Sequence, residues 1–90
     1  MRDYLLSSDL MRRPIHAHAI EVCEKHKISL NELKCPRRLG RYVRARQEFS
    51  YLAHEDGASF PQIGKFLGGR NHTTIITAVN RYKEREGIAL

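Results

Sequence analysis

Two consecutive glycines, Gly68 and Gly69, constrain the fold of this 90-residue chain more than any other feature. Glycine adopts backbone angles that other residues resist, so the pair predicts a tight turn. Arg70 and Asn71 follow, and then the sequence His-Thr-Thr over 72–74. Asparagine is a favoured N-cap, and imidazole and hydroxyl groups stand where a core helix would carry apolar ones. The segment therefore predicts a turn that delivers the polar start of an exposed helix, which can meet base edges or phosphates.

Length and composition indicate a single small globular domain. Hydrophobic residues make up 41% of the chain and charged residues 29%, which are ordinary values for globular proteins. No apolar run approaches the length needed to cross a bilayer, and residues 1–6 do not resemble a secretion signal. We therefore expect a cytoplasmic protein without a membrane partner. Two cysteines, Cys23 and Cys35, are too few for a disulfide framework, so both are expected to be reduced.

Positive charge is concentrated in one stretch of the chain. The balance of 16 Lys and Arg against 10 Asp and Glu gives a net charge of +6, which fits an anionic partner. Six basic residues, five of them arginine, lie between Lys34 and Arg46. A charge run alone is usually a solvated face, but arginine also favours phosphate forks and groove insertion. Beside the predicted turn, we expect Arg37, Arg41 and Arg44 to contact phosphates.

Apolar spacing and capping residues predict an all-α fold of about five helices. The expected helices cover residues 14 to 26, a short segment capped by Ser29 and ending before Pro36, residues 39 to 54, a short segment capped by Ser59, and residues 72 to 85. Ser29 with Glu32 and Ser59 with Gln62 have the form of capping boxes. A short helix, a glycine turn and a longer polar-fronted helix together predict a helix-turn-helix.

Aromatic residues at helical spacing are expected to build one core. Tyr42, Phe49, Tyr51 and Tyr82 are interpreted as packing residues and not as stacking platforms for single-stranded nucleic acid. The expected organisation is an N-terminal arm over residues 1–13, one domain over residues 14–86 and a tail over residues 87–90.

Histidines near the N-terminus and scattered polar residues suggest metal binding or catalysis as alternatives. His16, His18, Cys23 and His26 raise the question of a zinc site, but their spacing fits no standard structural site. His16 and His18 would also project on different sides of one helix. No nucleophile and base pairing is recognisable, and a small helical domain offers little room for a shielded cleft. We therefore predict no metal, no cofactor and no enzymatic activity.

Four segments of the chain resemble a known family. They are Ile28 to Leu33, Arg44 to Gln47, Ser59 to Gly64, and Gly69 to Thr74. In this order and spacing they resemble the C-terminal DNA-binding domain of DnaA, the bacterial replication initiator, over roughly residues 14 to 85. The resemblance implies a helix-turn-helix domain, related in fold to the tryptophan repressor, that binds short duplex sites called DnaA boxes.

The resemblance also implies roles for individual residues. The expected base contacts are Arg38 in the minor groove and, at the major groove, Pro61, Asn71, His72, Thr73 and Thr74. The expected phosphate contacts are Arg46, Gln47, Arg70 and Thr77, in addition to the three arginines already named. Asn71 stands where the family usually has aspartate, and asparagine can donate as well as accept. Thr77 stands where histidine is frequent in the family.

The functional expectation is sequence-specific binding of double-stranded DNA by a stand-alone domain. DnaA-box-like sites are the expected target, in replication initiation, its regulation or transcriptional control. The chain contains no GxxxxGK[ST] phosphate loop and is too short for the family's ATPase domain, so no ATP binding is expected. The alternative is a protein-interaction module that binds the replication initiator or its regulators without DNA.

Overall fold

Five helices make up the described part of the chain, residues 14–88 of the computed structural model. They are α2 (Ile15–His26), α3 (Leu30–Lys34), α4 (Gly40–Glu55), α5 (Phe60–Phe66) and α6 (His72–Glu86). Residues 14–88 contain no strand, so the all-α prediction is confirmed. The expected arm over residues 1–13 lies outside the described residues. None of the described helices is long and apolar enough to cross a membrane.

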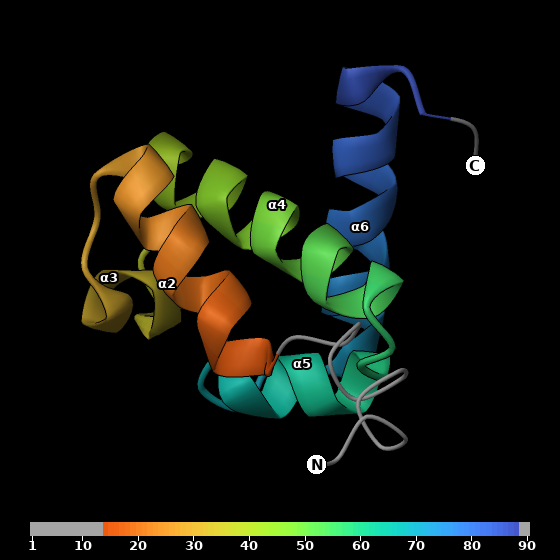
Figure 1. Ribbon diagram of the computed structural model, residues 1–90, viewed down its shortest axis with the longest axis horizontal. Helices are drawn as coiled ribbons and strands as arrows, with labels where there is room; N and C mark the ends of the chain where they lie inside the picture. The colour runs from red at the N-terminus through yellow and green to blue at the C-terminus, as the bar shows by residue number, and fades with distance from the viewer. Residues whose placement is uncertain (1–13, 89–90) are drawn as a thin grey trace, which may run out of the picture.

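The long helix α4 is the centre of the arrangement. Helix α2 runs alongside it, and α6 packs against its other side and extends beyond it (Figure 1). Helix α5 packs against the first part of α6, and α3 lies between α2 and α4 (Figure 1). Helix α5 also contacts the α2–α3 pair, because the Phe66 ring of α5 lies against His16 of α2 and Lys34 of α3.

Local side-chain caps set the helix starts that the sequence predicts. The Ser29 hydroxyl accepts from the Glu32 N–H at 3.0 Å, and the Ser29 N–H donates to the Glu32 carboxylate at 2.7 Å. Ser59 and Gln62 make the same reciprocal pair at the start of α5, with distances of 3.2 and 3.3 Å. Both capping boxes are thereby confirmed. Each satisfies two backbone donors that a helix start would otherwise leave unpaired.

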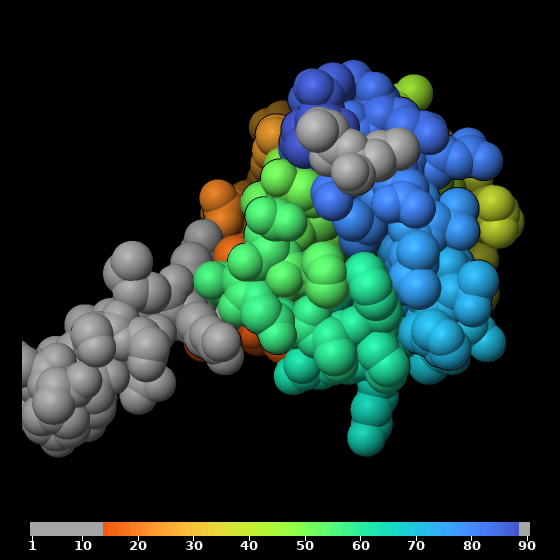
Figure 2. Space-filling model, turned by 90° about the vertical axis from the view of Figure 1, so that its right-hand side faces the viewer, coloured from red at the N-terminus to blue at the C-terminus, as the bar shows by residue number. Residues whose placement is uncertain are grey.

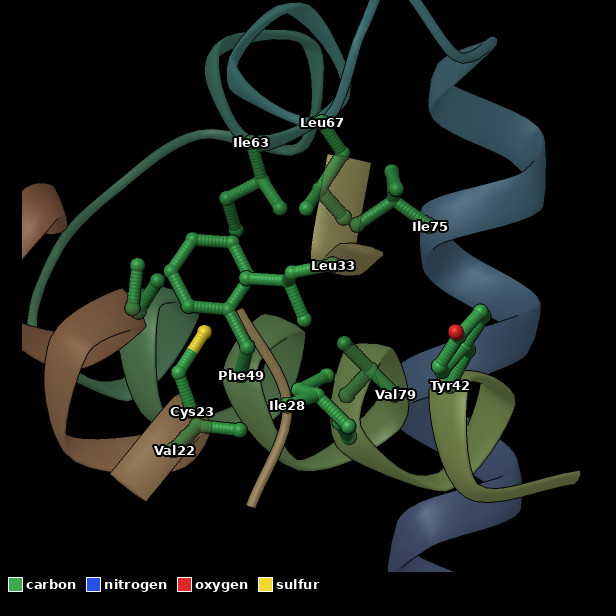
Figure 3. Packing of buried hydrophobic residues seen from close by; sticks show 13 residues of the cluster. Val22, Cys23, Ile28, Leu33, Tyr42, Phe49, Ile63, Leu67, Ile75 and Val79 are labelled. Carbon is green, nitrogen blue, oxygen red and sulfur yellow. The ribbon is translucent and has the colours of Figure 1, made fainter. Parts of the chain in front are cut away.

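The core forms around Phe49 of α4. Its fully buried ring is surrounded by apolar side chains from the other four helices and the α2–α3 connection, among them Val22, Ile28, Leu33, Ile63, Leu67, Ile75 and Val79 (Figure 3). Burying a side chain of this size contributes about 2–3 kcal/mol. The rings of Tyr51 and Tyr82 stack with centroids 4.9 Å apart and join α4 to α6. Packing of these aromatic residues agrees with the prediction.

Two of the three histidines considered as zinc ligands have acidic partners. His18 Nε2 lies 2.9 Å from Asp56 Oδ2, and His26 Nε2 lies 2.8 Å from Glu48 Oε1. Cys23 is a buried free thiol of the core, where burial raises its pKa and nearby Glu32 adds to the effect. Residues 14–88 contain no group of three or more histidine, cysteine, aspartate or glutamate side chains that could hold a metal ion.

A buried carboxylate ties α2 to α4. Glu48 is 8% exposed, and its two oxygens accept from Lys25 Nζ and His26 Nε2, each at 2.8 Å. Burial by itself would raise the pKa of Glu48, but the hydrogen bonds from Lys25 and His26 outweigh it and hold the pKa below its ordinary value. The same hydrogen bond raises the pKa of Lys25.

This contact predicts a loss of stability in acid. A carboxyl group with a depressed pKa in the folded state stabilises the fold above its unfolded pKa, near 4.5 for Glu48. The contribution disappears as the pH falls through the folded pKa. We expect Glu48→Gln to flatten the acid limb of the stability curve, measured as Tm from about pH 3 to pH 7. Glu55→Gln, an exposed change on the same helix, should keep the wild-type slope. A full acid limb in Glu48→Gln would contradict this assignment.

Candidate nucleic-acid interface

Helix α5, the turn after it and α6 form a helix-turn-helix. The turn closes on the Gly64 carbonyl, which accepts from the Gly69 N–H at 3.0 Å and the Arg70 N–H at 2.8 Å. Gly68 and Gly69 have φ values of +88° and +87°, in the region that favours glycine. The tight glycine turn predicted from the sequence is therefore present, and it places the start of α6 directly beside α5.

The expected major-groove residues gather at one end of α6. Asn71 is its N-cap, with Oδ1 accepting from the Thr73 N–H at 2.8 Å. The side chains there are exposed, namely Asn71, His72, Thr73, Thr74 and Thr77, and Pro61 is exposed in the first turn of α5. In Figure 2, α5 and the first part of α6 lie side by side on the surface. Exposed donors together with the positive end of the helix dipole suit an anionic or base-edge ligand.

A groove of about 330 Å³ lies beside this helix start, between α4 and α6. Its polar lining includes Arg38, Gln47, Arg70, Thr77 and Arg81. Three other arginines of the basic stretch are exposed on the α3–α4 connection and on α4, namely Arg37, Arg41 and Arg44. The structure thus brings four of the seven expected phosphate contacts to one groove next to the expected base contacts, namely Arg46, Gln47, Arg70 and Thr77.

Arg46 is bound to the backbone of the α3–α4 region. It is only 6% exposed, and its guanidinium donates to four backbone carbonyls, those of Glu32, Leu33, Cys35 and Arg37. Two of these carbonyls belong to the last turn of α3, where a cation satisfies unpaired acceptors. Burial lowers the pKa of Arg46, and the charge of Arg70 adds to the effect. Arg46 therefore holds the segment that carries Arg37 and Arg38, and because it also lines the groove, its phosphate contact stays a prediction.

Arg70 also has backbone partners. Its Nε donates to the Leu67 carbonyl at 3.1 Å and its Nη2 to the Cys35 carbonyl. The Cys35 carbonyl therefore accepts from both Arg46 and Arg70, which joins the α3–α4 connection to the helix-turn-helix. Arg70 is half-buried and lines the groove, and its phosphate contact stays a prediction.

Three residues have a place in the site that the sequence-based assignment did not include. Arg81 is exposed and lines the groove one turn after Thr77, and this four-residue spacing could have identified it. Arg85 donates to the Gln47 side-chain oxygen, which orients the Gln47 amide. Ser50 is fully buried in the groove wall, and its hydroxyl has no hydrogen-bond partner within residues 14–88. The roles of Arg85 and Ser50 depend on tertiary contacts, so no local sequence pattern indicates them.

Comparison with known proteins matches the part of the chain that contains the helix-turn-helix. Residues 19–81 match the family model of the bacterial DnaA protein helix-turn-helix. The chain is similar to chromosomal replication initiator protein DnaA of Streptococcus agalactiae serotype Ia, with 39% identity over 71 residues that cover 78% of this chain and 16% of that protein. The protein of the same name from Roseobacter denitrificans is 37% identical over 83 residues, which cover 86% of this chain and 18% of that protein. The DnaA protein from Ruegeria sp. is 38% identical over 69 residues, which cover 76% of this chain and 15% of that protein.

The chain spans less than a fifth of the length of these curated relatives. No solved structure matches it. The family match begins in α2 and ends in α6, so it includes the basic stretch, the glycine turn and the exposed start of α6. On this match and on the helix-turn-helix geometry, the chain belongs to the family of the bacterial DnaA helix-turn-helix.

Proposed function

We propose that this domain binds double-stranded DNA sequence-specifically, at DnaA-box-like sites, through the start of α6. The observation that carries the proposal is the exposed polar cluster of Asn71, His72, Thr73 and Thr74 beside a cationic groove. The relatives are named as chromosomal replication initiator proteins, which supports a role connected with replication initiation. Binding by this domain requires neither ATP nor a metal.

Affinity and sequence specificity come from two kinds of contact. Arg37, Arg41 and Arg44, all exposed, neutralise phosphates and supply affinity that depends on salt and not on sequence. The start of α6 enters the major groove, whose base edges carry a distinct donor and acceptor pattern for each base pair. Arg38, exposed in the α3–α4 connection, enters the adjacent minor groove.

The remaining groove residues hold the backbone next to the bases. Gln47, Arg70, Thr77 and Arg81 line the groove between α4 and α6, where a phosphate would receive several donors at once. Arg46 acts indirectly, because it holds the α3–α4 connection through backbone carbonyls. The groove thereby fixes the register in which α6 meets the base edges.

The test is fluorescence anisotropy with a DnaA-box duplex and a shuffled duplex across a salt series. We expect preference for the box at each salt concentration while overall affinity falls as salt rises. His72→Ala should lower the ratio of box to shuffled affinity by about fivefold or more, because it removes a base contact. Arg44→Ala should weaken both duplexes about equally and reduce the salt slope by about one.

Two outcomes would contradict the proposal. If both variants weakened both duplexes equally, base reading by α6 would be wrong. If neither duplex were bound, the protein-interaction module would replace DNA binding, and a salt-insensitive complex with the replication initiator would support that alternative.

A further inference from the structure

The N-cap of α6 fixes how Asn71 faces a ligand. Its Oδ1 accepts from the Thr73 backbone N–H at 2.8 Å, and its φ of −64° and ψ of 143° are those of an N-cap outside the helix. A backbone N–H is only a donor, so the amide atom that faces it has to be the oxygen. The orientation of the amide is therefore set by hydrogen-bond chemistry.

The amide nitrogen of Asn71 remains available to a partner. Asn71 is exposed, and its Nδ2 has no hydrogen-bond acceptor among residues 14–88. The amide nitrogen carries two N–H donors and no acceptor. The Asn71 oxygen is already engaged by the Thr73 N–H, so the two amide N–H donors are the groups that the side chain leaves fully available to a partner.

The bases differ in whether they can accept a hydrogen bond from such a donor in the major groove. Guanine presents two acceptors, O6 and N7, and thymine presents O4. Cytosine presents an amino donor, and adenine presents an amino donor beside its N7 acceptor. The usual bidentate pair of asparagine with adenine needs the amide oxygen and nitrogen together on the base edge. In this protein the oxygen is turned toward the Thr73 N–H, so that pair is disfavoured.

We propose that Asn71 makes this protein select a keto base, guanine or thymine, at one position of its DNA site. The inference rests on the proposed DNA binding and names one determinant of its specificity. His72 and Thr73 are exposed beside Asn71 and read other positions, so the test has to change the Asn71 amide alone.

Asn71→Asp changes that amide alone. Aspartate is as good an N-cap as asparagine, so one carboxylate oxygen keeps the bond to the Thr73 N–H. The other oxygen replaces the outward donor with an acceptor, which suits the amino group of cytosine or adenine. Asn71→Ser is the matched control, since serine also caps the helix but offers no group at the same reach.

The experiment selects bound duplexes from a library with a random core, using wild type, Asn71→Asp and Asn71→Ser in parallel. We expect one position at which wild type enriches guanine or thymine and Asn71→Asp enriches adenine or cytosine. Asn71→Ser should show no preference there and keep the rest of the motif. Anisotropy on two duplexes that differ at this position should give a preference of about fivefold for wild type, reversed in Asn71→Asp.

The preference is compared within each protein, because the added negative charge of Asn71→Asp weakens binding to every duplex. Identical motifs for wild type and Asn71→Asp would overturn the inference while leaving DNA binding intact. A wild-type preference for adenine or cytosine at the position that changes in Asn71→Ser would overturn it as well. If wild type enriched no sequence at all, the proposed function itself would fail.

Discussion

Arg46→Ala is expected to destabilise the domain by about 3 kcal/mol or more, which lowers Tm by roughly 12 °C or more for a domain of this size. The guanidinium is buried and donates to four carbonyls, so its removal leaves several acceptors without their donor. The last turn of α3 also loses the cation at its negative end. Thermal unfolding followed by far-UV circular dichroism measures the change.

Two further variants separate this role from loss of charge. Arg44→Ala removes an exposed arginine from the same helix and should change stability by less than about 0.5 kcal/mol. Arg46→Lys keeps the charge, but an ammonium cannot reproduce the planar fork that reaches several carbonyls, so most of the loss should remain. Equal stability of Arg44→Ala and Arg46→Ala would refute a structural role for Arg46.

Gly64→Ala is expected to disrupt the helix-turn-helix. A Cβ at this position would lie 2.2 Å from the Arg70 carbonyl oxygen and 3.2 Å from its carbon. Both are backbone atoms, so α5 and the turn would have to separate. The Gly64 carbonyl would then also lose the N–H donors of Gly69 and Arg70. We expect a loss of about 3 kcal/mol in the free energy of unfolding, from overpacking and the broken turn, and reduced binding to the box duplex.

Gly40→Ala provides the matched control for this substitution. Gly40 begins α4, and a Cβ there meets no atom within 4 Å. Because alanine is also the better helix former, the variant should be unchanged or slightly more stable, within about 0.5 kcal/mol. Chemical denaturation of both variants gives the comparison. If Gly64→Ala were as stable as Gly40→Ala, close approach of α5 to the turn would not explain the glycine.

Helix limits and caps could be predicted because they depend on neighbouring residues. The predicted helices over 14 to 26 and 39 to 54 correspond to Ile15–His26 and Gly40–Glu55. The cap at Asn71 and the glycine turn also follow from short-range chemistry, namely a side-chain acceptor and positive φ angles. The exposed start of α6 was predictable for the same reason.

The role of Arg46 could not be predicted from charge pattern or from family resemblance. Arg46 follows Tyr42 by four residues and precedes Phe49 by three, so helical spacing places it on the buried face of α4. Its partners, however, are carbonyls nine to fourteen residues away, set by how α3 ends and how the connection folds back. Likewise, the hydrogen bond from Arg85 to Gln47 spans 38 residues and exists only because α6 packs on α4.

The stacked pair of Tyr51 and Tyr82 gives this domain an intrinsic optical reporter. The chain has no tryptophan and four tyrosines, so tyrosine dominates its near-ultraviolet absorption. Two of those rings are held face to face across the contact of α4 with α6, the helix that carries the proposed base-reading end. Near-ultraviolet circular dichroism of the unlabelled, DNA-free protein therefore follows the relative position of these two helices, and variants at their contact can be compared by it.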